Sequence, residues 1–92
     1  EPRLNFFGKW VIVDSTNKSA IHHFLTFTED NILVSDITLP TISQSTYTYD
    51  MKAKQWKDNN GYSITCDITD KNHCSIICIH NNQTISYTLE RQ

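Results

Sequence analysis

Residues 62–89, YSITCDITDKNHCSIICIHNNQTISYTL, contain three short runs separated by two polar turns. Apolar side chains occupy every second position of the first and last runs: Tyr62, Ile64, Cys66, Ile68, Ile85, Tyr87 and Leu89. A period of two places successive side chains on opposite faces of a strand, so these runs predict half-buried β-strands. The turns at 70–72 and 81–82 consist of Asp, Asn and Lys, which favours hairpin connections.

The same spacing extends over the rest of the chain. Further short runs occupy residues 10–13, 21–28, 32–37, 46–49 and 55–57, and no stretch has a clear period of 3.6 residues. The eleven Ile and eleven Thr suit a pleated surface. We therefore predict an all-β fold with little or no helix: one domain, residues 1–92, forming a small eight-stranded antiparallel meander barrel. Closure into a barrel removes the exposed strand edges.

Composition and motifs exclude several functions. The net charge is −2 without a basic run, so a nucleic-acid surface is not expected. No apolar stretch reaches the roughly 20 residues of a membrane-spanning helix. With two Gly in total, a phosphate-binding loop is excluded, and G-x-S-x-G and H-E-x-x-H do not occur. We predict no enzymatic activity, no cofactor and no metal site.

The two ends of the chain supply a matching pair. Gly8 and Trp10 open the first predicted strand, and Arg91 closes the last. In a closed meander these two strands are neighbours, so the guanidinium of Arg91 is expected to lie on the Trp10 indole at the barrel floor. Such a pair stabilises a fold by about 0.5–2 kcal/mol and requires no ligand.

Gly8-x-Trp10, the meander and the terminal Arg91 together resemble the lipocalin signature. The stretches 47–64 and 81–91 are similar to strands of short periplasmic co-regulators of the ToxS, VtrC and PsaF kind. That resemblance implies a periplasmic domain, tethered to the inner membrane by an upstream segment. It also implies a membrane-bound transcription activator as partner, and a small apolar ligand such as a bile salt or fatty acid.

Several residues are candidates for binding or sensing. In a ligand-holding barrel, inward side chains would line the cavity, and the candidates are Leu25, Phe27, Tyr62 and Tyr87. His23 shares the parity of the inward positions and is a candidate pH sensor, because histidine titrates near neutral pH. The alternative is that all four histidines are polar groups on the surface or rim.

The three cysteines allow more than one arrangement. If a three-residue loop, 71–73, joins the sixth and seventh strands, Cys66 lies opposite Cys78, and these two form a disulfide. A tighter turn favours Cys66 with Cys74, and the third possibility is three reduced thiols that pack as small apolar groups.

Two other functions remain open at this point. An inhibitor or immunity protein would block an enzyme through exposed loops, for which 14–19 and 51–61 are the candidates. A structural envelope lipoprotein would need neither loop.

Overall fold

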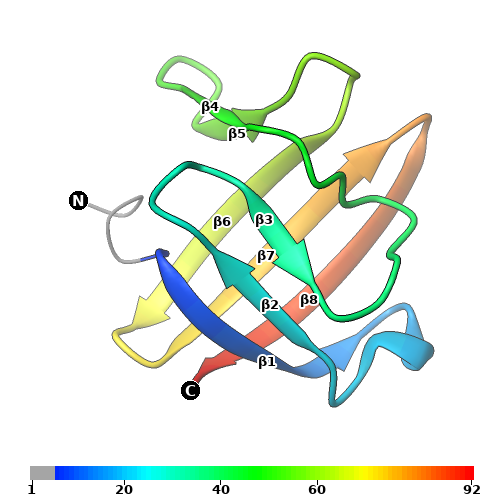
Figure 1. Ribbon diagram of the computed structural model, residues 1–92, viewed down its shortest axis with the longest axis vertical. Coiled ribbons are helices and arrows are strands. Elements are labelled where there is room, and N and C mark those ends of the chain that lie inside the picture. The colour runs from blue at the N-terminus through cyan, green and yellow to red at the C-terminus, as the bar shows by residue number, and fades with distance from the viewer. Residues whose placement is uncertain (1–5) are drawn as a thin grey trace.

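A computed structural model describes residues 6–92 of the chain, and it is all-β (Figure 1). The eight strands are β1 Gly8–Ser15, β2 Phe24–Phe27, β3 Leu33–Ser35, β4 Thr48–Asp50, β5 Gln55–Lys57, β6 Ser63–Asp70, β7 His73–His80 and β8 Gln83–Arg91. A single 3₁₀ turn, η1, covers Lys18–Ala20. The predicted all-β class and the number of strands are confirmed.

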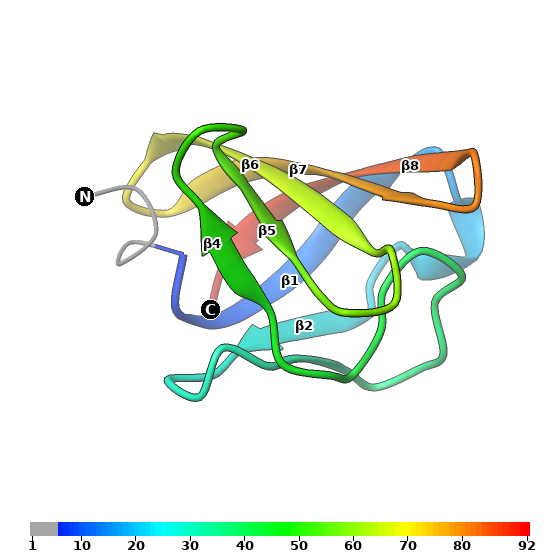
Figure 2. The same ribbon diagram turned by 90° about the horizontal axis from the view of Figure 1, so that it is seen from above.

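The strands form one antiparallel sheet in the order β3-β2-β1-β8-β7-β6-β5-β4. β1 and β8 are neighbours, with Trp10 opposite Arg91, so the predicted contact between the first and last strands is confirmed. In Figure 2 the sheet curls from β4 and β5 through β6, β7 and β8 to β1 and β2. The two edge strands of the sheet are β3 and β4. Within residues 6–92, two contacts connect the segments just before these strands: an isolated bridge from Ile32 to Thr46, and a hydrogen bond from Tyr47 N to Asn31 O (2.8 Å).

The second predicted strand, 21–28, is shorter than expected and starts only at Phe24. His22 has a φ of 76°, which interrupts the extended backbone. Its N–H donates to Ile12 O (2.8 Å) instead of continuing a regular ladder. The neighbouring His23, which the alternation placed among the inward positions, is not part of the core, and about a third of its side chain is exposed.

The connection from β3 to β4, residues 36–47, crosses the barrel mouth, and we call it the strap. Leu39, Thr41, Ile42 and Tyr47 of the strap are buried against the sheet. The barrel interior is filled by side chains that the strands and the strap direct inward, among them Trp10, Ile12, Leu25, Phe27, Ile76, Tyr87 and Leu89. The interior is therefore a packed core, as expected for a barrel of this size.

The predicted disulfide between Cys66 and Cys78 is wrong. The β6–β7 turn has two residues, Lys71 and Asn72, with Asp70 opposite His73 and a bulge between Ile68 and Asp70. This shifts the register by two positions, so Cys66 faces Ile76 and Cys78 faces Ile64. Cys66, Cys74 and Cys78 are all free thiols.

Two of these thiols are held in their protonated form. A hydrogen bond with Cys66, together with burial, raises the pKa of Cys74. Burial raises the pKa of Cys78. Because the thiolate is the reactive species, Cys74 and Cys78 behave as small core side chains.

Candidate functional site

A hollow of about 470 Å³ opens where β4 separates from the β2–β3 turn. The lining residues, which define the seam hollow, are Phe7, Asn31, Thr46, Tyr47, Thr48, Tyr49 and Trp56. It lies next to the last hydrogen bond across the seam, from Tyr47 N to Asn31 O. The hollow therefore forms at the point where the barrel stops being closed by hydrogen bonds.

Aromatic rings make up the floor and walls of the seam hollow. Trp56 is 3% exposed and forms the floor, while Phe7 and Tyr49 are half-buried. The Tyr49 ring meets Trp56 at a centroid distance of 5.2 Å and 64°, and the Phe7 ring meets it at 6.5 Å and 65°. Both rings thus meet the indole at a steep, edge-on angle, a favourable arrangement for aromatic pairs.

The rim of the seam hollow is polar. Asn31, Thr46 and Thr48 contribute amide and hydroxyl groups, and among residues 6–92 no Asp, Glu, Lys or Arg belongs to the lining. Apolar walls with a few polar groups are the usual composition of sites for small organic molecules. The hollow is also within the size range of such sites.

None of the four residues predicted to line a ligand cavity lines the seam hollow. Leu25, Phe27 and Tyr87 are buried in the core. Phe27 packs behind the hollow: its ring stacks on Phe7 at 5.0 Å and meets Trp56 edge-on at 4.8 Å and 74°. Tyr62 lies elsewhere and stacks on His80, with ring centroids 3.6 Å apart.

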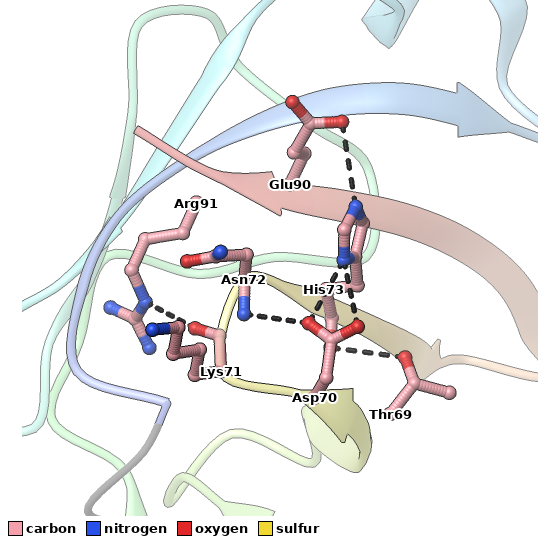
Figure 3. Close-up of polar contacts among 7 residues, drawn as sticks. All are labelled: Thr69, Asp70, Lys71, Asn72, His73, Glu90 and Arg91. Atoms are coloured by element: carbon pink, nitrogen blue, oxygen red, sulfur yellow. Dashed lines mark hydrogen bonds and ion pairs between the residues drawn. The ribbon is translucent and has the colours of Figure 1, made fainter.

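The barrel floor carries the predicted aromatic–cation pair. The Arg91 guanidinium carbon lies 4.1 Å from the centroid of the Trp10 ring. Arg91 Nη1 donates to Phe7 O (2.6 Å), and Nε donates to Lys71 O (2.8 Å), a contact drawn in Figure 3. Trp10 Nε1 donates to Phe6 O (2.8 Å). We call this arrangement the Arg91 clamp, because it joins β1, β8, the β6–β7 turn and the segment before β1.

Gly8 fits the Arg91 clamp because it has no side chain. Its φ is 119°, and a Cβ placed there would lie 2.7 Å from Arg91 Nη1. A β-carbon is disfavoured at such a φ and would also collide with the guanidinium. The Gly-x-Trp spacing thus has a direct structural cause in this chain.

A charged cluster lies beside the clamp (Figure 3). His73 Nδ1 is 2.9 Å from Asp70 Oδ1, and His73 Nε2 is 3.7 Å from Glu90 Oε2. The hydrogen bond and charge of Asp70, with the charge of Glu90, raise the pKa of His73. The N–H of Asn72 and the His73 ring lower the pKa of Asp70.

The signs of these pKa changes predict how the cluster depends on pH. A raised histidine pKa contributes stability below the unfolded value of about 6.5, and this contribution is lost as pH rises through the folded pKa. A lowered aspartate pKa contributes above about 3.9 and is lost as pH falls through the folded pKa. The pair therefore stabilises the fold fully between these two values.

We expect His73→Gln to destabilise the protein most near pH 5.5 and progressively less toward pH 8.5. Urea unfolding of both proteins at several pH values measures this difference. The control, His22→Asn, removes an exposed histidine outside the cluster and should show no such trend. A difference that stays constant over this pH range would contradict the prediction.

His23, the predicted pH sensor, lies at the rim of the barrel. Its Nδ1 is 3.0 Å from Asp36 Oδ2, and about a third of its side chain is exposed. The hydrogen bond from His23, with one from the Phe24 N–H, lowers the pKa of Asp36. His23 therefore fixes the start of the strap at the surface and does not reach the seam hollow.

A second carboxylate fastens the strap over the barrel mouth. Asp58 Oδ2 accepts hydrogen bonds from Ser43 Oγ (2.6 Å) and Ser45 Oγ (2.7 Å). Its Oδ1 accepts from the backbone N–H of Asn60 and of Tyr62, both at 2.9 Å. Partial burial acts to raise the pKa of Asp58, but these hydrogen bonds outweigh it and the pKa lies below its usual value.

Sequence reasoning did not single out the residues of the seam hollow. Tyr49 and Trp56 stand in short predicted strands, and Phe7 precedes the first, so each reads as an ordinary core or rim aromatic. Their assembly depends on the divergence of β4 from the β2–β3 turn. No local pattern marks that divergence.

Comparison with known proteins gives no assignment: no family model, curated protein or solved structure matches this chain. No helix within residues 6–92 has the length and apolar character needed to cross a membrane. That same part of the chain has no group of three or more His, Cys, Asp or Glu side chains placed to hold a metal ion.

Proposed function

We propose that this chain is a non-enzymatic binding domain that takes a small amphipathic molecule in the seam hollow. The observation that carries the proposal is an aromatic-walled hollow of about 470 Å³, lined within residues 6–92 by uncharged side chains, at the open side of a barrel whose interior is filled. A ligand would place an apolar face against Phe7 and Tyr49 and its polar groups toward Asn31 and Thr48. Bile salts and fatty acids are the ligand classes to test first.

In the cell we propose a periplasmic co-regulator that stabilises a membrane-bound transcription activator and reports the ligand to it. Support for this role comes from the resemblance of Gly8, Trp10, Arg91 and the meander to co-regulators of this kind. The position of the hollow also supports it. Because the hollow is open to the outside of the barrel, a bound ligand would remain within reach of a partner protein.

The binding proposal is tested by titrating the protein with taurodeoxycholate, whose sulfonate stays ionised over the whole working pH range. We expect saturable binding that changes the fluorescence of Trp56, together with about ten-fold weaker binding by Tyr49→Ala, because one aromatic wall is lost. Isothermal titration calorimetry gives the affinities.

The matched control is Tyr62→Ala, which removes a half-buried aromatic residue outside the hollow. Its affinity should equal that of the unmodified protein. If the bile salt and a long-chain fatty acid both fail to bind at concentrations below their aggregation limits, the proposed function is wrong. Equal weakening by both variants would place the ligand elsewhere.

A further inference from the structure

Phe7 belongs to two sites at once. Its ring is a wall of the seam hollow and stacks on Phe27 at 5.0 Å. Its carbonyl oxygen accepts the hydrogen bond from Arg91 Nη1 at 2.6 Å. The backbone that carries this wall is therefore attached to the barrel floor by a charge-assisted hydrogen bond, a strong kind of contact.

The guanidinium is itself fixed from several directions. It lies over the Trp10 ring at 4.1 Å, and its Nε donates to Lys71 O in the β6–β7 turn. The backbone N–H of Arg91 donates to Asn72 O (2.7 Å) in the same turn. A planar fork held in this way presents Nη1 in one direction, which a flexible ammonium group cannot reproduce.

Gly8 adds a second constraint next to Phe7. Its φ of 119° sets the direction in which the chain enters β1 from Phe7, and Nη1 occupies the space where a Cβ would stand. The place of the Phe7 ring thus follows from the backbone of Gly8 and the fork of Arg91, in addition to ring packing.

We propose that Arg91 is a positioning residue for the seam hollow, and that its hold on the Phe7 carbonyl sets the gap between the Phe7 and Tyr49 rings. This inference rests on the proposed binding function. The Arg91 clamp already has a structural role, because it closes the barrel by joining β1 to β8. The inference adds a second role, in ligand affinity.

The test is the affinity of Arg91→Lys for taurodeoxycholate, measured well below the midpoint of thermal unfolding. Lysine keeps the charge but cannot donate to Phe7 O and Lys71 O together. We expect binding about three- to ten-fold weaker, the loss that follows from one misplaced contact. Aromatic NMR shifts of the Phe7 ring should move as well, while those of Tyr62 should not.

A core variant separates positioning from general destabilisation. Ile76→Val removes one methyl group from the buried face of β7 and lowers stability without touching the hollow. Its affinity should match that of the unmodified protein. If Arg91→Lys is poorly folded, Gly8→Ala replaces it, because the added Cβ displaces Nη1 while the guanidinium is retained.

The outcomes are distinct. Weaker binding together with a moved Phe7 ring supports the positioning role. Unchanged affinity in a folded Arg91→Lys or Gly8→Ala protein overturns it and leaves the binding function intact. Weakening by Ile76→Val to the same degree also overturns it. No binding by the unmodified protein rejects the binding function and this inference together.

Discussion

Replacing Trp10 with alanine will reduce the free energy of unfolding by about 3–5 kcal/mol, the usual cost of truncating a large buried aromatic side chain. Trp10 is fully buried. Its removal leaves a cavity on the barrel floor and deprives Arg91 of its aromatic partner. It also leaves Phe6 O without the indole donor. For a domain whose total stability is expected to be about 5–10 kcal/mol, at least about a third of the folding free energy would be lost.

Urea unfolding followed by far-UV circular dichroism measures this effect. In Trp10→Ala, Trp56 is the one remaining tryptophan, and its fluorescence gives a second probe of unfolding. Trp10→Phe is the matched variant, because it keeps an aromatic face under the guanidinium but lacks the N–H. Its cost should be clearly smaller. If Trp10→Ala lowered stability by less than about 1 kcal/mol, the indole would be a minor part of the core.

The second large effect is expected at Asp58. Asp58→Ala should cost about 2–3 kcal/mol, because hydrogen bonds to a charged group are worth more than neutral ones. Ser43 and Ser45 would lose their acceptor, and the strap would lose its fastening to the β5–β6 turn. Thermal unfolding, with hydrogen exchange of the strap amides, measures both consequences.

Acid should weaken the same fastening. Since the pKa of Asp58 lies below its usual value, its contribution is present above about pH 3.9 and is lost as pH falls through the folded pKa. The exposed carboxylate of Asp67 provides the control: Asp67→Ala should change stability by less than about 0.5 kcal/mol. Equal losses in the two variants would show that the hydrogen bonds of Asp58 are unimportant.

The strands that could be predicted are those whose pattern is local. The alternation from Tyr62 to Leu89 determines β6, β7 and β8, and pairing of the chain ends follows from closing a meander. Turn length is different. A two-residue turn in place of a three-residue loop moves the register by one position, and the bulge between Ile68 and Asp70 moves it by one more. Neither change carries a signal in the sequence, and the expected pairing of the cysteines depended on both.

The candidate site could be predicted far less well. The floor pair, Trp10 and Arg91, came from the expectation that the two ends meet. The seam hollow combines residues from four separate segments, and it exists because β4 leaves the β2–β3 turn after one bridge. Inward parity identified Leu25 and Phe27, but the packing of the strap decided that the inward space is core.

The pairing of β1 with β8 also has a kinetic consequence. These strands pair residues some 70–80 positions apart, such as Trp10 with Arg91. Each hairpin can form early from nearby segments, but the ring is completed only when the two ends of the chain find each other. Topologies dominated by such distant contacts fold in milliseconds to seconds, so the floor of this barrel is expected to be assembled in the slow, final stage.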